Sequence, residues 1–165
     1  MLPAVVTGLS AVYSTPRGPA PTARRVASYT AILAAGLQHL DCTLLNADAF
    51  DTLQVEAGAG SDALMAAARK SGYNLRRASA TSIGITLDET TTREDITALW
   101  GVFAGQRELP GFGQFEQGIA LPIPASLARS SAFLTHPVFN RHHSETEMLR
   151  YIRSLADKDL ALDRT

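Results

Sequence analysis

The sequence predicts an α+β protein, a two-layer α-β-α-β-β-α sandwich followed by an extended linker and a helix. Three observations predict this class. Apolar residues recur at helical spacing in residues 23–40, and short segments with alternating apolar residues, typical of strands, occur between residues 42 and 87. From about residue 106 the periodicity is replaced by prolines and glycines, which indicate an irregular segment.

The first helix is predicted over residues 23–40. A break precedes it, because residues 13–22 hold three prolines and a glycine, and Thr22 can act as the N-cap. The apolar positions of this helix share one face: Val26, Tyr29, Leu33, Leu37 and Leu40. The apolar run before the break is too short to span a bilayer and follows no basic segment of the kind that begins a secretory signal. We expect residues 1–22 to be the truncated end of a large-domain element.

Short strands and two further helices are predicted next. The expected strands are residues 42–45, 50–57, 75–78 and 82–87. A helix over residues 62–70 would begin after Ser61 as N-cap and end before Gly72. The following helix has two possible capping boxes, Thr91 with Glu94 or Thr92 with Asp95. Residues 23–105 are therefore predicted to form one small α+β domain.

Residues 106–143 are predicted to be an extended linker. They contain repeated prolines and glycines and no clear periodicity, and the segment is too long for an ordinary connection inside a compact domain. We expect Arg107–Leu134 to make few contacts with residues 23–104. Ser144 and Glu147 form a capping-box pattern, which predicts that a helix opens the last segment, residues 144–165.

Charge and cysteine content exclude several classes of function. The formal net charge of −1 gives no electrostatic basis for binding nucleic acid or an anionic membrane. Cys42 is the only cysteine, so neither an intramolecular disulfide nor a CxxC metal or redox motif can form. A single cysteine is compatible with a reducing compartment.

The histidines do not have the spacing of a metal site. His136, His142 and His143 lie within one short run, but this spacing matches no standard zinc signature and no second cluster of ligands exists. We therefore predict no metal site. The run can instead serve helix entry and an interface, or it can form one wall of an active site.

Two other groupings of polar residues favour structural interpretations. Asp88 and Glu89 are adjacent carboxylates, but they directly precede a capped helix, where they favour turn formation and interact well with the helix N-terminus. Ser144 lies between His143 and Glu145, yet sequence neighbours do not adopt the mutual geometry of a catalytic triad. No phosphate-binding glycine loop is present. The residues alone predict an α+β domain without a complete catalytic site.

Phe50–Leu53 (FDTL) and Ile83–Thr92 (IGITLDETTT) are two distinctive segments of the chain. Together with further segments spread over nearly the whole chain, they resemble the P-protein of the glycine cleavage system. Leu134–Arg141 (LTHPVFNR) and His143–Tyr151 (HSETEMLRY) are very specific to that family, and Lys158–Leu162 (KDLAL) follows in register. By this resemblance the chain is identified as an internal fragment that spans the junction of the two related halves of the family.

The resemblance implies a fold-type-I enzyme that uses pyridoxal phosphate, a glycine dehydrogenase (decarboxylating). Such an oxidoreductase releases carbon dioxide from glycine and passes the aminomethyl group to the lipoyl arm of the H-protein. Residues 23–105 would correspond to the small C-terminal domain of the first half. The implied partners are the remainder of the P-protein and the lipoylated H-protein, with neither nucleic acid nor membrane. The implied location is the bacterial cytoplasm or, in a eukaryote, the mitochondrial matrix.

Two departures from the family pattern bear on activity. The family's "AVY" is usually followed by "HGP", whereas this chain has Ser14–Pro19 (STPRGP), so that histidine is missing. The only lysines, Lys70 and Lys158, do not match the family's cofactor lysine. We therefore expect no pyridoxal phosphate bound to this chain alone and no activity of the chain by itself. The alternative is a stand-alone α+β interaction or regulatory module without catalysis.

Site residues are expected in the run from Thr135 to Ser144, which combines imidazole, amide, guanidinium and hydroxyl groups. By resemblance this run should line the approach to the cofactor in the complete enzyme. The candidates are His136 and Asn140, which could orient groups near the substrate, with His143 as a third. The alternative is that the run only docks the second half of the enzyme onto the first.

Overall fold

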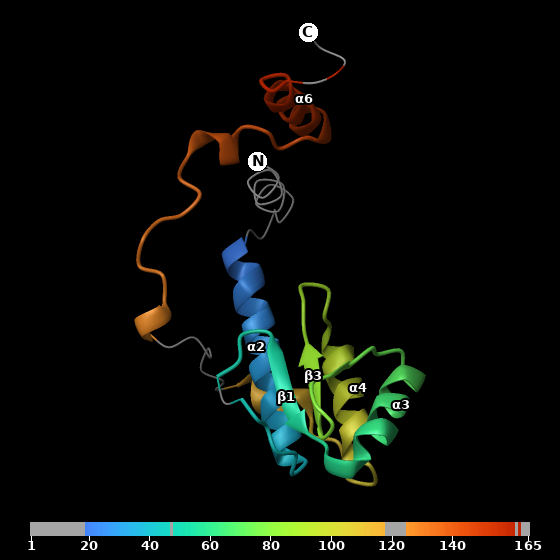
Figure 1. Ribbon diagram of the computed structural model, residues 1–165. Coiled ribbons are helices and arrows are strands. Elements are labelled where there is room, and N and C mark those ends of the chain that lie inside the picture. The colour runs from blue at the N-terminus through green and yellow to red at the C-terminus, as the bar shows by residue number, and fades with distance from the viewer. Residues whose placement is uncertain (1–18, 47, 118–124, 161, 163–165) are drawn as a thin grey trace. The chain divides into compact units, whose positions relative to one another are not determined.

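The computed structural model describes residues 19–46, 48–117, 125–160 and 162 (Figure 1). Residues 23–128 form one compact unit, and residues 129–160 belong to a second. The expectation for residues 1–22 lies almost entirely outside the described residues. The helices and strands of the described parts are α2 (Pro19–His39), β1 (Thr52–Glu56), α3 (Ser61–Lys70), β2 (Arg76–Arg77), β3 (Ser82–Thr86), α4 (Arg93–Ala104), α5 (Phe112–Glu116) and α6 (Glu145–Ala156), with short 3-10 turns at Gly58–Gly60, Ala125–Leu127 and Pro137–Asn140.

The α+β class is confirmed, and the first hundred residues follow the predicted order of elements. The sheet is antiparallel, with strand order β1-β3-β2. The register pairs Leu53 with Ile85 and Val55 with Ile83, so four buried apolar side chains lie on one face of the sheet. The alternate positions of β1 are polar and less buried, as expected for a sheet that is covered on one face only.

Helix α2 presents the predicted apolar face. Val26, Leu33 and Leu37 are all buried, with Leu33 and Leu37 fully inaccessible to solvent. The helix begins earlier than expected, at Pro19, because proline is compatible with the first turn, where its missing N–H has no helical partner. Thr22 therefore lies inside the helix, and its predicted role as N-cap is wrong.

The strand expected at residues 42–45 is reduced to one isolated bridge, between Leu44 and Val55. The other strands are confirmed with shorter limits, and β2 keeps only two residues. Ser61 does not cap α3 as predicted, because Gly60 occupies the N-cap position after a 3-10 turn. Ser61 is instead the first helical residue, and its buried hydroxyl donates to the Gly58 carbonyl at 2.8 Å.

Helix α4 begins with the second of the two possible capping boxes. The Thr92 hydroxyl accepts a hydrogen bond from the Asp95 amide, and the Asp95 carboxylate accepts one from the Thr92 amide at 2.8 Å. In Figure 1, α2 and α4 lie behind β1 and β3 and cover the apolar face of the sheet. The helices and the sheet share one hydrophobic core, so residues 23–105 contain two layers.

Trp100 of α4 packs directly against α2. Its fully buried indole donates a hydrogen bond from Nε1 to the Leu33 carbonyl at 3.1 Å. Gly36, one turn further along α2, faces the same ring, and a Cβ atom added there would lie 2.1 Å from the indole Cε2. A glycine is therefore required at this position for the two helices to approach this closely.

The segment expected to be an extended linker is partly packed onto the core. Phe112 and Phe115 of α5 contact the Trp100 ring edge-on or tilted, with centroid separations of 6.3 and 5.8 Å. Arg93 of α4 forms an ion pair with Glu116. The expectation of few contacts is therefore wrong for α5, and no strand occurs among the described residues of 106–143. The division of the chain into four segments stays a prediction.

Candidate functional site

The run from Thr135 to Ser144 forms a single 3-10 turn followed by the start of α6. Leu134, which precedes the run, has a φ of 54°, a left-handed conformation that is unfavourable for a residue with a side chain. His136 is the N-cap of the turn, and its Nδ1 accepts a hydrogen bond from the Val138 amide at 3.2 Å. Pro137 occupies the first position of the turn, as is common after a cap. The His136 ring therefore has a structural role at the entry to this turn, in keeping with the structural interpretation of the histidine run, although the sequence did not identify it as an N-cap.

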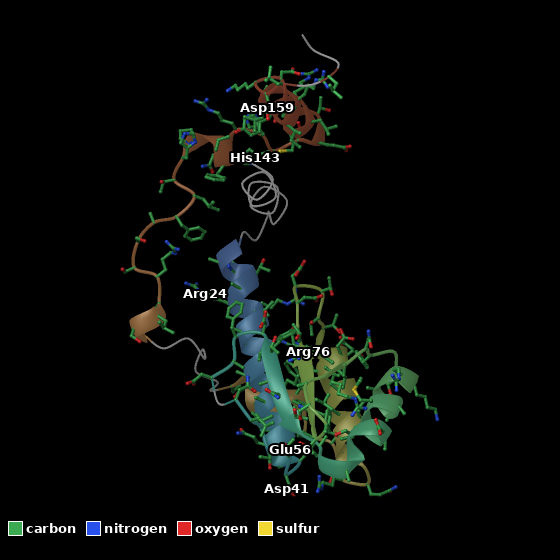
Figure 2. The ribbon with its side chains drawn as sticks, viewed as in Figure 1. Arg24, Asp41, Glu56, Arg76, His143 and Asp159 are labelled. Carbon is green, nitrogen blue, oxygen red and sulfur yellow. The ribbon has the colours of Figure 1, made fainter. Side chains whose placement is uncertain are left out.

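The three predicted site residues lie in one short segment of the chain. His136, Asn140 and His143 are all exposed. Figure 2 places His143 just before α6, where its backbone amide donates to the Glu147 carboxylate at 3.2 Å. None of these three side chains lines either of the two cavities described below. Their roles as site residues stay a prediction.

Helix α6 begins at the predicted capping box. The Ser144 hydroxyl accepts a hydrogen bond from the Glu147 amide at 3.2 Å, and the Glu147 carboxylate accepts from the Ser144 amide at 3.4 Å. Both carboxylates of the first turn, those of Glu145 and Glu147, lie at the positive end of the helix. The capping box thus fixes where the helix starts and which side chains share each face.

An open hollow of about 520 Å³ lies beside α6. We call it the Arg141–Arg150 hollow, and its lining residues are Arg141, His142, Glu147, Arg150, Tyr151 and Ser154. The four residues from α6 follow the spacing i, i+3, i+4 and i+7, which places them on one helix face. His142 stacks on Tyr151 with ring centroids 4.4 Å apart and an interplanar angle of 12°.

Sequence reasoning did not select His142 as a site residue. His142 was considered only together with His136 and His143, as part of a run that could serve helix entry, an interface or the wall of an active site. The signal that could have found it was the adjacency of Arg141 and His142 to a helix face carrying Arg150 and Tyr151. That signal requires knowing how the loop folds back on α6, which the residue spacing does not provide.

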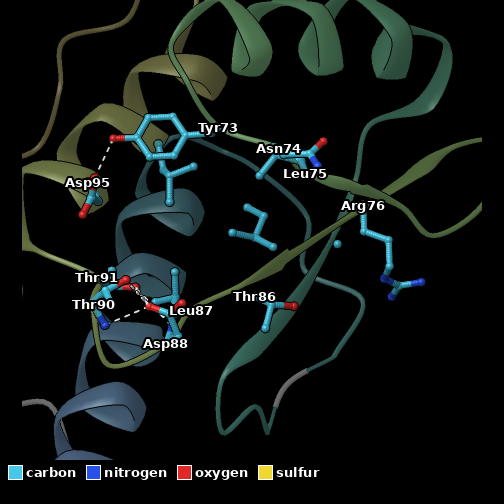
Figure 3. A pocket seen from close by; sticks show the side chains of 13 residues that line it. Tyr73, Asn74, Leu75, Arg76, Thr86, Leu87, Asp88, Thr90, Thr91 and Asp95 are labelled. Carbon is cyan, nitrogen blue, oxygen red and sulfur yellow. Dashed lines mark hydrogen bonds between the residues drawn. The ribbon is translucent and has the colours of Figure 1, made fainter.

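A second cavity, of about 290 Å³, lies in the unit of residues 23–128 (Figure 3). It forms where the chain before β2 separates from β3, between Tyr73–Arg76 on one side and Gly84–Thr91 with the start of α4 on the other. Figure 3 shows Tyr73 pointing toward Asp95, and its hydroxyl donates to the carboxylate at 2.9 Å. Partial burial and this hydrogen bond raise the pKa of Tyr73, while bonds from Thr92 and Tyr73 lower the pKa of Asp95.

Asp88, which lines this cavity, has the predicted role in forming the turn before α4. The Asp88 carboxylate accepts hydrogen bonds from the Thr90 hydroxyl at 2.6 Å and the Thr90 amide at 2.9 Å. These bonds lower the pKa of Asp88, so it is ionised at neutral pH and unsuited to donating a proton. The Arg25 guanidinium donates to the Glu89 and Thr91 carbonyls, which fixes the loop against α2. We therefore assign the Asp88 carboxylate and the Glu89 backbone to loop formation.

The described residues also bear on cofactors and membranes. No group of three or more histidines, cysteines or acidic residues is placed to hold a metal ion in the described ranges. Among the same residues, no helix combines the length and apolar character needed to cross a bilayer. Lys70 ends α3 and Lys158 follows α6, and both are exposed.

Comparison with known proteins identifies the family. Residues 1–103 match the family described as "Glycine cleavage system P-protein". This match covers more than half of the chain. The chain belongs to the glycine cleavage system P-protein family.

Similar relatives extend this family assignment to the whole chain. A "Glycine dehydrogenase (decarboxylating)" of Cupriavidus metallidurans is 54% identical over 165 residues, covering 100% of this chain and 17% of the relative. Proteins of the same name from Paraburkholderia phytofirmans and Variovorax paradoxus are 48% and 49% identical over 98% and 100% of this chain, again 17% of each relative. The chain therefore spans about one sixth of the length of the P-proteins that it matches.

Proposed function

We propose that this chain is one segment of a glycine dehydrogenase (decarboxylating), the P-protein of the glycine cleavage system. The observation that carries the proposal is the similarity to P-proteins of that name along the entire chain, from the first residue to the last. The complete enzyme would use pyridoxal phosphate, release carbon dioxide from glycine and transfer the aminomethyl group to a lipoylated H-protein. The relatives are bacterial, which supports a cytoplasmic location.

The lysines of the described residues do not fit pyridoxal phosphate. A lysine that forms a Schiff base needs a lowered pKa, which burial or a neighbouring cation provides. Lys70 and Lys158 are both exposed, and neither lines the Arg141–Arg150 hollow or the cavity beside Tyr73. We therefore derive no catalytic step through either lysine and propose that the cofactor lysine belongs to the remainder of the P-protein.

Within the complete P-protein, residues 23–105 would act as a small two-layer domain at the end of the first half. Their sheet carries helices on its apolar face, the arrangement expected of the small C-terminal domain in fold-type-I enzymes. Residues 106–143 would connect this domain to α6, which would open the second half. The alternative of a stand-alone interaction module is not favoured, because the similarity to glycine dehydrogenases leaves no part of the chain unmatched.

The proposal is tested on the complete polypeptide that contains this segment. We expect the purified protein with pyridoxal phosphate and lipoylated H-protein to exchange labelled bicarbonate into the carboxyl group of glycine. The same protein without H-protein is the control and should exchange far more slowly. A complete protein that binds the cofactor but shows no glycine-dependent exchange would contradict the proposal.

We further propose that His136, Asn140 and His143 line the approach to the cofactor in the complete enzyme. The structure suggests how to separate this role from docking, because His136 also caps a 3-10 turn. Asparagine is a good N-cap, so His136→Asn should restore a lost cap, whereas His136→Ala removes both cap and imidazole. A rate defect in both variants with unchanged melting temperatures would support a site role. Rescue by asparagine, or equal loss of rate and stability, would favour docking.

A further inference from the structure

We propose that the Arg141–Arg150 hollow binds a small oxyanion of the phosphate class, held between its two guanidinium groups. The inference concerns residues 141–154 of this chain and does not depend on the proposed enzymatic function. It begins from the charges that line the hollow, because two cations face it from different elements. Arg141 follows the 3-10 turn, while Arg150 lies in the middle of α6.

The two arginines lack acidic partners within the described residues. Neither Arg141 nor Arg150 forms an ion pair there, although both are exposed. Arg153, on the same helix, shows the contrast, because its guanidinium pairs with Asp157 at 3.0 Å. An unpaired guanidinium presents its N–H groups in a fixed fork that matches the oxygens of phosphate or carboxylate. Two such forks beside one hollow favour an anionic ligand.

One carboxylate also lines the hollow and offsets part of the positive charge of the two arginines. The Glu147 carboxylate accepts hydrogen bonds from the backbone amides of His143 and Ser144, so these bonds hold it at the N-terminus of α6. The lining therefore carries two arginine charges against one carboxylate charge, so a positive charge remains beside the hollow. The Ser154 hydroxyl donates to the Tyr151 carbonyl at 2.7 Å, so we do not count it as a donor to the ligand.

The stacked rings give the hollow a fixed wall. His142 and Tyr151 are half-buried and nearly parallel, which holds the loop carrying Arg141 against the helix face carrying Arg150. The hollow, at about 520 Å³, lies in the size range of small-molecule sites. A tetrahedral oxyanion offers oxygens in several directions and can accept from both forks at once, which a single planar carboxylate does less well. We therefore favour phosphate over carboxylate.

The test is calorimetric titration of the full 165-residue chain at low ionic strength with inorganic phosphate, phenyl phosphate and benzoate. We expect saturable binding of both phosphates and weaker binding of benzoate. Arg141→Gln and Arg150→Gln should each weaken phosphate binding by about tenfold or more, since hydrogen bonds to charged groups are strong. Arg153→Gln is the matched control on the same helix and should change the affinity less than about twofold, as a paired surface charge does.

Each contrary outcome overturns the proposal. Phosphates that fail to saturate show that no site exists, and equal losses in Arg153→Gln and Arg150→Gln show only general attraction to a basic helix. Benzoate that binds as tightly as phenyl phosphate shows a carboxylate site. An acidic peptide that binds while both phosphates fail shows a protein-docking surface instead. Circular dichroism of each variant checks that α6 is retained. Arg150→Lys separates charge from geometry, because lysine keeps the positive charge but lacks the forked guanidinium.

Discussion

Replacing Gly36 by alanine should disrupt the contact between α2 and α4. The added Cβ would lie 2.1 Å from the Cε2 atom of Trp100, whereas carbon atoms pack at about 3.5–4.0 Å. The helices would have to separate by roughly 1.5 Å, or the indole would have to rotate. Rotation is restricted, because the ring is fully buried and its Nε1 donates to the Leu33 carbonyl.

The expected loss of stability follows from two opposing effects. Overpacking a well-packed core costs about 1–3 kcal/mol and occasionally more. Alanine favours the helix over glycine by about 1 kcal/mol, which offsets part of that cost. Because the overlap at Gly36 is with a rigid ring, we expect the upper end of the range and a net loss of about 2 kcal/mol.

Urea unfolding of the chain followed by far-UV circular dichroism measures this loss. With a slope of about 2 kcal/mol per molar urea, the midpoint for Gly36→Ala should fall by about 1 M. Gly101→Ala is the matched control, because Gly101 is an exposed glycine of α4 with no atom within 4 Å of its added Cβ. It should leave the midpoint unchanged or raise it, by up to about 1 kcal/mol of stability. A Gly36→Ala midpoint equal to or above the wild-type value would refute the helix contact described here.

Three further predictions concern the buried face of α2, the N-cap of α4 and the dependence of stability on pH through Asp95. Leu33→Ala should lower the unfolding free energy by about 2–5 kcal/mol, because it removes a buried side chain. Gln38→Ala, on the exposed face of the same helix, should change it by less than about 0.5 kcal/mol. Similar values for both variants would mean that the buried face is misassigned. Thr92→Ala should cost about 0.5–2 kcal/mol through loss of the capping box, measured in the same unfolding assay, and Thr92→Ser should recover most of it. The pKa of Asp95 is lowered in the folded state, so its contribution to stability is present above its unfolded pKa of about 4 and is lost as pH falls through the folded value. Asp95→Asn should flatten the decline of stability below about pH 4, and an unchanged acid limb would contradict that assignment.

The elements that could be predicted are those set by local patterns. The buried face of α2 follows from apolar spacing, and the capping boxes at Thr92 and Ser144 follow from side chains three residues apart. The start of α2 could not be predicted in the same way, because proline can either interrupt regular structure or occupy the first turn of a helix. At Pro19 it occupies the first turn. The ambiguous pair of capping boxes was resolved only by the structure.

The features that could not be predicted depend on contacts between distant residues. Helix α5 has five residues, too few to show periodicity. It is stabilised by contacts of Phe112 and Phe115 with Trp100 of α4. The expected strand at residues 42–45 makes only one bridge, between Leu44 and Val55. Whether such a segment pairs fully depends on its position beside β1, which local sequence does not determine. In the candidate site, the sequence did not identify His136 as an N-cap, because histidine is uncommon at that position.

The burial of Trp100 gives this protein a built-in optical reporter. It is the only tryptophan of the 165 residues, and it sits between α2, α4 and α5 in the unit of residues 23–128. Selective excitation of the indole therefore follows the melting of that unit alone, while circular dichroism also records α6. A difference between the two melting curves would measure how far the unit of residues 23–128 unfolds independently of α6.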